Sequence, residues 1–163
     1  LRVPLVVYDP RLPDPQHGQV IPQIALNSDL ASTMIELAGL PIPKAHTGRS
    51  LVPLIRGDKV SDWRKDFLCE FLAVPQTIPL WEGVHGENAT YARYFVDGPN
   101  EPPYEFLHDL KKDPQQLINL ATESVAHPLL KRMRNRCDQL VATAGPSMND
   151  VFKIHIKPPK PSN

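Results

Sequence analysis

Alternation of apolar and polar residues is clearest at residues 90–97, where the chain reads TYARYFVD. A period of two residues is typical of a strand with one face on a core. Shorter strands of this kind are predicted at residues 67–73, 82–86 and 105–110. The tripeptide GEN at residues 86–88 fits a hairpin turn, and GPN at residues 98–100 fits the next reversal. The pattern therefore predicts a small antiparallel sheet of about four strands.

The apolar period becomes that of a helix from Pro128 onward. One stripe of this helix is apolar and consists of Leu129, Leu130, Met133, Cys137, Leu140 and Val141. Such a stripe is expected to cover one face of the sheet. Four bases lie mostly on the other side, where a solvated surface is expected: Lys131, Arg132, Arg134 and Arg136. The predicted fold class is therefore α+β, with a small antiparallel sheet and one packed C-terminal helix.

The first part of the chain has a different pattern. Residues 1–8 are almost continuously apolar, which is typical of a strand buried on both faces. Residues 28–38 predict a helix that Asn27 or Ser28 caps and that Gly39 ends. Its apolar stripe is Leu30, Met34, Ile35, Leu37 and Ala38. A second, short helix is predicted at residues 50–56, closing at Gly57.

Two further segments carry local signals. Residues 113–116 (DPQQ) have the composition of a helix start, because Asp113 can accept from early amides and Pro114 suits the first turn. Residues 151–156 alternate and are predicted to pair as an edge strand, before a Pro-rich tail. We therefore expect one further helix start and one further strand beyond the central pattern.

Composition excludes several classes of partner. The 163 residues carry a formal net charge of zero, so neither nucleic acid nor an anionic membrane is expected as a partner. No apolar run reaches the roughly 18 residues that a membrane-spanning helix needs. The two cysteines, Cys69 and Cys137, lie among apolar residues and are expected to be buried free thiols.

The most specific signature is the run YEFLHDLKKDPQQLINLA at residues 104–121. It resembles the end of the sulfatase family, in which "L-Y-D-L … D-P-x-E … N-L-A" is usual. Residues 1–10 and 28–54 resemble the same family in order and spacing. The resemblance implies that residues 1–60 are a remnant of the large α/β domain, that residues 61–145 form the small C-terminal α+β subdomain, and that residues 146–163 are an irregular tail.

The resemblance also implies where the chemistry lies. Sulfatases use a formylglycine made from cysteine in a Cys-x-Pro-x-Arg or similar motif, together with a divalent cation such as calcium or magnesium. Neither Cys69 nor Cys137 stands in such a motif, and no catalytic or metal-binding residue is identified in this chain. We therefore expect the nucleophile and the metal ligands upstream, and we expect this part of the enzyme to be inactive alone.

Four residues are candidates for substrate contact. His85 and Trp81 lie on a strand where relatives often have a basic residue near the active-site cleft, and Glu70 and Arg93 share the neighbourhood. The competing interpretation for each is an ordinary structural role. His108 replaces the tyrosine of the family run and is expected to be a packing residue.

The resemblance implies a sulfated small molecule or carbohydrate as substrate and an extracytoplasmic location. Two alternatives stay open: a phosphodiesterase or phosphonate hydrolase of the same alkaline-phosphatase-like superfamily, and a stand-alone, non-catalytic binding module. Self-association through residues 1–9 is also expected, because an apolar strand without neighbours offers a free edge.

Overall fold

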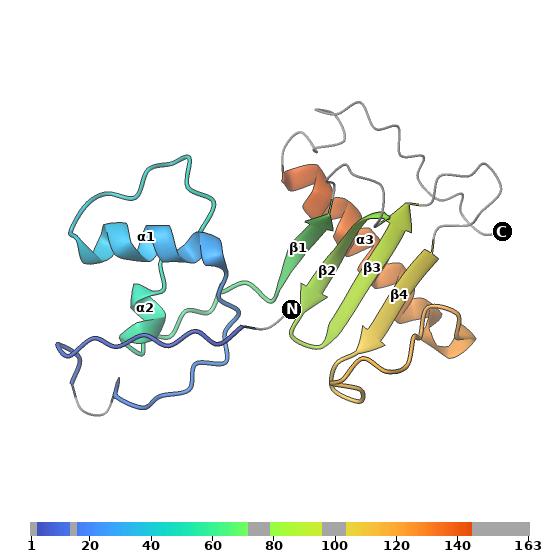
Figure 1. Cartoon of the computed structure of the whole chain (residues 1–163), viewed down its shortest axis with the longest axis horizontal. Helices are drawn as coiled ribbons and strands as arrows, with labels where there is room; N and C mark the ends of the chain where they lie inside the picture. Colours follow the sequence, from blue (N-terminus) through green and yellow to red (C-terminus); the bar gives the residue numbers. More distant parts are fainter. Residues whose placement is uncertain (1–2, 14–15, 72–78, 96–103, 145–163) are drawn as a thin grey trace. The chain divides into compact units, whose positions relative to one another are not determined.

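The computed structural model describes residues 3–13, 16–71, 79–95 and 104–144. The chain forms two compact units, which are residues 1–64 (unit 1) and residues 65–163 (unit 2) (Figure 1). The sequence interpretation sets this boundary after residue 60. Each unit is described by itself below.

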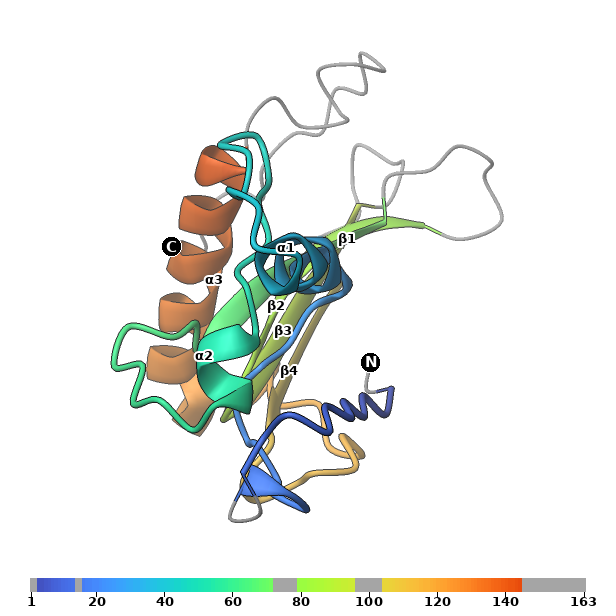
Figure 2. The same cartoon turned by 90° about the vertical axis from the view of Figure 1, so that its left-hand side faces the viewer.

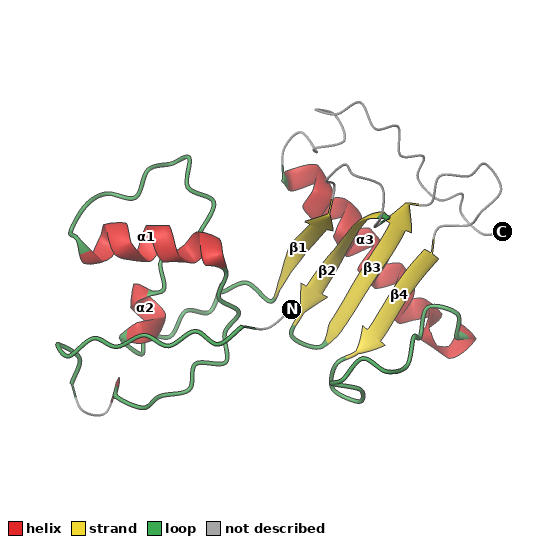
Figure 3. Cartoon of the chain, viewed as in Figure 1, coloured by secondary structure: helices red, strands yellow, loops and turns green. Residues whose placement is uncertain are grey.

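Unit 2 contains a four-stranded antiparallel sheet in the order β1-β2-β3-β4 (Figure 3). The strands are β1 (Asp66–Phe71), β2 (Leu80–Gly86), β3 (Ala89–Phe95) and β4 (Tyr104–Asp109). Glu87 and Asn88 form the turn between β2 and β3, so that His85 lies opposite Thr90 and Glu82 opposite Arg93. The predicted sheet, its strands and its hairpin are therefore confirmed.

Helix α3 (His127–Thr143) lies along one face of this sheet (Figure 2). The predicted stripe is confirmed, since Leu130, Met133 and Cys137 are buried in one core cluster with residues of β2, β3 and β4. Leu129, Leu140 and Val141 are partly buried against this cluster. The helix begins one residue before the predicted Pro128, after the short 3-10 helix η2 (Ser124–Ala126). Burial of this stripe is the main contact that joins the helix to the sheet.

The four bases of α3 all reach solvent, as expected, but two of them also form ion pairs with carboxylates of the sheet. Lys131 and Arg132 are exposed. Arg134 instead pairs with Glu105 of β4, and the Arg136 Nη2 atom lies 2.7 Å from Asp66 Oδ1. A long side chain can lay its aliphatic stem on the core and still bring its charge to a carboxylate at the sheet.

The part of the signature run that follows β4 forms a structured loop and does not begin a helix. Asp113 Oδ2 accepts a hydrogen bond from the Ile118 amide at 2.8 Å, and Gln116 has a φ of 58°, outside the helical region. The helix start predicted at Asp113 is therefore wrong, because its carboxylate closes a loop. Asp113 and Ile118 thus shape the segment that returns the chain to β4.

Asn119 attaches this returning segment to the free edge of β4. Its Oδ1 atom accepts from the Leu107 amide at 3.0 Å, and its Nδ2 atom donates to the Glu105 carbonyl at 3.0 Å. The Leu120 amide donates to the Leu107 carbonyl at 2.8 Å. An edge strand needs such partners for its backbone groups. The aspartate and asparagine of the signature run therefore serve the fold of unit 2.

Unit 1 contains α1 (Asn27–Leu37) and α2 (Val52–Ile55). Both helices are predicted, and Gly39 (φ 72°) and Gly57 (φ 81°) follow them in the left-handed region as expected. Neither Asn27 nor Ser28 caps α1. Its first turn is closed by Asp29, whose Oδ2 atom accepts from the Leu26 amide at 2.8 Å.

The face of α1 that unit 1 buries is polar. Its buried residues are Asp29, Ser32 and Thr33, whereas Met34 of the predicted apolar stripe is 67% exposed. Of the apolar stripe, Leu30 packs against the small core of unit 1, so the stripe is only partly covered within this unit. The buried polar residues form long-range hydrogen bonds, from the Arg64 guanidinium to both Asp29 oxygens and from Ser32 Oγ to the Gly48 carbonyl.

Cation–π contacts also stabilise this part of unit 1. The guanidinium carbons of Arg49 and Arg64 lie 4.5 and 5.0 Å from the ring centroid of Trp63. Trp63 also packs in a small core with Leu51 and Leu54. The polar and apolar contacts together join α1, α2 and the end of unit 1.

The strand predicted at residues 1–8 is wrong for the described residues 3–8. They have no regular secondary structure, and Val6 and Tyr8 are 87% and 82% exposed. A strand needs a neighbour for its backbone hydrogen bonds, and none of the described strands pairs with this segment. The strand predicted at residues 151–156 lies outside the described residues. Within the described part of the chain, no helix has the length and apolar character required to cross a bilayer.

Candidate functional site

The face of the sheet opposite α3 is rich in aromatic rings. Alternate residues of each strand point to this side, because their neighbours Leu68, Val84, Tyr91 and Leu107 pack toward α3. We call this surface the aromatic face. Its ring-bearing residues are Phe67, Phe71, Trp81, His85, Tyr94, Tyr104, Phe106 and His108.

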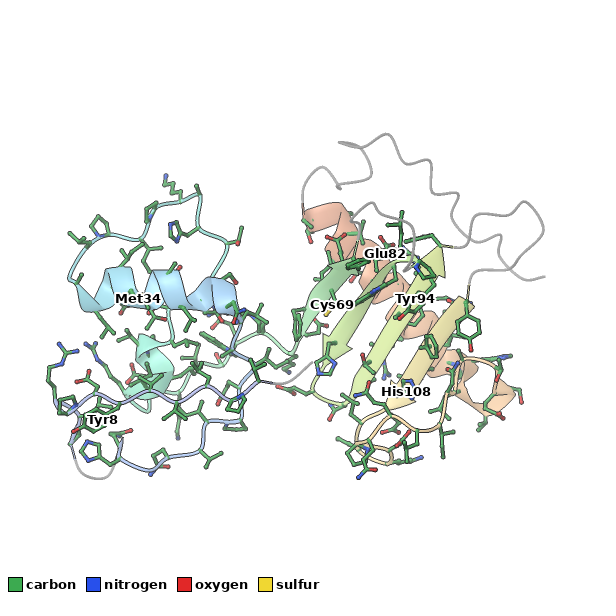
Figure 4. The ribbon with its side chains drawn as sticks, viewed as in Figure 1. Tyr8, Met34, Cys69, Glu82, Tyr94 and His108 are labelled. Carbon is green, nitrogen blue, oxygen red and sulfur yellow. The ribbon has the colours of Figure 1, made fainter. Side chains whose placement is uncertain are left out.

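The rings of the aromatic face contact one another across the strands. The centroids of Trp81 and Tyr94 are 6.0 Å apart, those of Tyr94 and Phe106 are 5.5 Å apart, and those of Tyr104 and Phe106 are 4.8 Å apart. Figure 4 labels Tyr94 and His108 on this sheet. Ring pairs of this kind contribute about 0.5–1.5 kcal/mol beyond area burial. The aromatic face is therefore held in place by its own contacts.

The middle of the aromatic face has small side chains. Gly83 lies between Cys69 and Ala92 in the register of the sheet. A Cβ atom on Gly83 would lie 2.2 Å from the Tyr91 carbonyl oxygen, so any larger residue would push the strands apart. Close strand packing thus requires the glycine, and the surface between neighbouring rings has no long side chain.

The structure places two of the four predicted site residues, Trp81 and His85, on the aromatic face. The His85 ring is 5.5 Å from the Phe67 ring, and Trp81 is paired in register with Phe71 and Tyr94. Both belong to β2, on either side of Gly83, and four residues of strand separate them by about 13 Å. They point to the same side and can contact different parts of one extended ligand.

The other two predicted residues, Glu70 and Arg93, lie on the α3 face of the sheet. Arg93 pairs with Glu82, and its Nη1 atom lies 2.7 Å from Asp138 Oδ1 of α3. Burial alone would lower the pKa of Arg93, but these carboxylates outweigh it and raise the pKa. Burial, followed by the charge of Glu82, raises the pKa of Glu70. The structure therefore does not bring Glu70 and Arg93 together with Trp81 and His85.

Glu105 forms a second polar group beneath α3. It pairs with Arg134 and accepts a hydrogen bond from Tyr91 Oη at 2.6 Å. Burial alone would raise the pKa of Glu105, but the hydrogen bonds from Arg134 and Tyr91 lower it. Burial, together with the hydrogen bond to Glu105, raises the pKa of Tyr91. These groups fix the helix to the sheet with their charges satisfied.

The sequence reasoning missed five rings of the aromatic face as site candidates: Phe67, Phe71, Tyr94, Tyr104 and Phe106. The signal that could identify Tyr94, Tyr104 and Phe106 is the alternation of β3 and β4, read together with the hairpin register; Phe67 and Phe71 depend on the pairing of β1 with β2. His108 is buried as expected and stacks on Phe106, with its Nδ1 atom 2.8 Å from the Ile118 carbonyl oxygen. It therefore packs between the sheet and the loop.

The two cysteines are packed side chains with neutral thiol groups, as their pKa values indicate. Burial raises the pKa of Cys69 and raises the pKa of Cys137 to about 12, so both are neutral near pH 7. Within the described ranges, no three His, Cys, Asp or Glu side chains come together in a way that could hold a metal ion. The residues described here therefore do not fit a catalytic cation or a modified cysteine.

The chain matches the family model "N-sulphoglucosamine sulphohydrolase, C-terminal" over residues 1–143. It is 31% identical over 121 residues to a Delta 4,5-hexuronate-2-O-sulfatase from Bacteroides thetaiotaomicron, covering 69% of this chain and 23% of that protein. It is 25% identical over 174 residues to the N-acetylglucosamine-6-sulfatase of Homo sapiens, covering 90% of this chain and 31% of that protein. The chain thus spans about a quarter to a third of the length of these relatives.

A solved structure has the same fold. The structure of a 2-O GAG sulfatase superposes with a TM-score of 0.64 at 27% identity, covering 79% of this chain and 26% of that one. With the family match over residues 1–143, the chain belongs to the sulfatases of the alkaline-phosphatase-like superfamily and is a C-terminal region of that family.

Proposed function

We propose that this chain is the C-terminal region of an enzyme that hydrolyses sulfate esters of carbohydrates. The observation that carries the proposal is the family match over residues 1–143, in agreement with relatives that are sulfatases. In this proposal the chain contributes substrate contacts and the rest of the enzyme supplies the reaction. An extracytoplasmic location, as in the family resemblance, is part of the same proposal.

The nucleophile and the cation belong to other parts of the complete enzyme in this proposal. Sulfatase chemistry uses a formylglycine and a divalent cation, which polarises the sulfate group when bound. Cys69 and Cys137 are neutral, packed thiols, and the described residues form no cation site. We therefore expect the chain alone to release no sulfate from an activated aryl sulfate, and turnover that persists through repurification would contradict this.

Trp81 and His85 are the proposed substrate contacts. An indole ring offers an apolar face to the C–H groups of a sugar and an N–H donor at its edge. A histidine N–H can donate to sulfate oxygens. Both side chains lie on the aromatic face, whereas Arg93 is held by Glu82 on the other face. The proposed contacts therefore rest on Trp81 and His85 rather than on Glu70 and Arg93.

The test uses the complete protein that carries this region. Trp81→Ala and His85→Ala are each compared with the parent protein on a sulfated oligosaccharide, and we expect KM to rise by about tenfold, as loss of roughly 1.4 kcal/mol of binding requires. His127→Ala is the matched control, since His127 is exposed at the start of α3. An unchanged KM in both Trp81→Ala and His85→Ala would overturn the proposed contacts.

A further inference from the structure

A hollow of about 550 Å³ lies on the helix side of unit 2, between α3 and the start of β1. Its lining comes from one side of α3 and from Asp66, the first residue of β1. We call it the helix hollow. Its polar lining consists of Asp66, Lys131, Arg132, Asn135, Arg136 and Gln139. Because α3 covers the opposite side of the sheet, the helix hollow is separate from the aromatic face.

The charge of the helix hollow is positive. Three basic side chains line it against a single carboxylate, that of Asp66. Arg136 forms an ion pair with this carboxylate, with Nε–Oδ2 and Nη2–Oδ1 distances of 2.8 and 2.7 Å. Lys131 and Arg132 are exposed, and neither forms an ion pair with a described carboxylate. An excess of two positive charges therefore faces the helix hollow.

The remaining lining also suits an anion. Pro128 lies in the first turn of α3, which has 17 residues and no acidic residue in that turn. The partial positive charge of a helix N-terminus is therefore not compensated there. The amides of Asn135 and Gln139 add neutral N–H donors along the same side of the helix. Charge, dipole and amides thus favour a ligand that carries anionic groups on a polar frame.

We propose that the helix hollow binds a sulfated saccharide unit, as a second contact for the polymer on which the enzyme acts. This inference rests on the proposed function for its choice of polymer. The helix hollow is open to solvent, which suits a polar saccharide chain lying across it rather than an enclosed small molecule. The zero net charge of the chain favours such a local site over the broad basic field that binds nucleic acid.

The experiment is a titration of the full 163-residue chain with a size-defined heparin oligosaccharide, its desulfated counterpart and inorganic sulfate. We expect saturable binding of the sulfated oligosaccharide, and we expect the Lys131→Ala/Arg132→Ala double variant to bind about tenfold more weakly. The matched control is Lys111→Ala/Lys112→Ala, which removes the same charge from an exposed turn outside the hollow. Circular dichroism verifies that each variant is folded.

Three outcomes would overturn the proposal: equal weakening in both double variants, equal binding of the desulfated oligosaccharide, or inorganic sulfate binding as tightly as the oligosaccharide. The first means general charge attraction, and the last means an adventitious ion only. Because this readout is binding and not turnover, failure here leaves sulfate release by the complete protein untouched. Conversely, binding that depends on Lys131 and Arg132 stands even if the complete protein releases no sulfate.

Discussion

We predict that Asn119 of the signature run stabilises the edge of the sheet that β4 forms. Its side chain makes hydrogen bonds with the Leu107 amide, the Glu105 carbonyl and the Ala121 amide, each at 3.0 Å. Asn119→Ala removes all three and leaves two backbone groups of β4 without their partners. We expect the variant to fold, with a less stable unit 2 and a loosened returning loop.

The expected loss in the free energy of unfolding is about 2–3 kcal/mol, since each hydrogen bond contributes a net value of roughly 0.5–1.5 kcal/mol. The Leu107 residue is 0% exposed, so water cannot easily replace the lost acceptor there. Asn119→Asp keeps the acceptor and loses the donor to the Glu105 carbonyl. A carboxylate oxygen then faces the Glu105 carbonyl oxygen, so this variant should also lose stability.

Urea unfolding monitored by circular dichroism gives the free energy, and hydrogen exchange of the Leu107 amide gives the local effect. Gln115→Ala is the control, because Gln115 is an exposed amide in the same loop and its loss should change stability by less than about 0.5 kcal/mol. If Asn119→Ala behaves like Gln115→Ala, and Leu107 keeps its protection, the structural explanation of the signature run is refuted.

Three further predictions concern the core, the charges and the first segment. Met133→Ala should destabilise the chain by about 2–5 kcal/mol in denaturant unfolding, because Met133 is buried in the core beneath α3; a loss below about 0.5 kcal/mol would place it at the surface. The lowered pKa of Glu105 means that its stabilising effect is present above the unfolded value of about 4.3 and is lost as pH falls through the lower folded value. The Tm difference between the parent chain and Glu105→Gln should therefore shrink as the pH falls below about 5, and a difference that stays constant over the acid range would contradict this. Deleting residues 1–9 should reduce self-association in light scattering, since Val6 and Tyr8 are largely exposed, while circular dichroism stays unchanged; an unaltered association state would exclude this segment as the cause.

Most of unit 2 could be predicted from local sequence. Three local signals were sufficient: the alternation of β3, the turn at Glu87 and Asn88, and the stripe of α3. Each signal is formed by residues that are close together in the sequence. Each signal follows from the period of a strand or a helix, which depends only on backbone geometry. The architecture of one sheet with one packed helix followed from these periods.

Partners that are distant in sequence could not be predicted in this way. Arg136 pairs with Asp66 across 70 residues, and Arg64 pairs with Asp29 across 35 residues. The first contact draws a base of α3 to the sheet, and the second buries the polar side of α1. Helical periodicity shows which residues share a face, but it does not show what that face meets.

Only part of the candidate site could be predicted from the sequence. A two-residue turn places Gly86 opposite Ala89, and it follows that Glu82 lies opposite Arg93. Arg93 must therefore be on the opposite face from Trp81, and this could have been read from the hairpin alone. The separation of Glu70 from Trp81 follows from the pairing of β1 with β2, for which the sequence has no comparable signal.

The central claim is that the complete protein carrying this region hydrolyses sulfate esters. The most direct measurement compares kcat/KM of that protein for an aryl sulfate, an aryl phosphonate monoester and an aryl phosphodiester, with sulfate release from a sulfated saccharide recorded in parallel. We expect kcat/KM to be highest for the sulfate ester and sulfate to be released from the saccharide. Efficient hydrolysis of the phosphonate or phosphodiester, with no sulfate released from either sulfated compound, would contradict the claim.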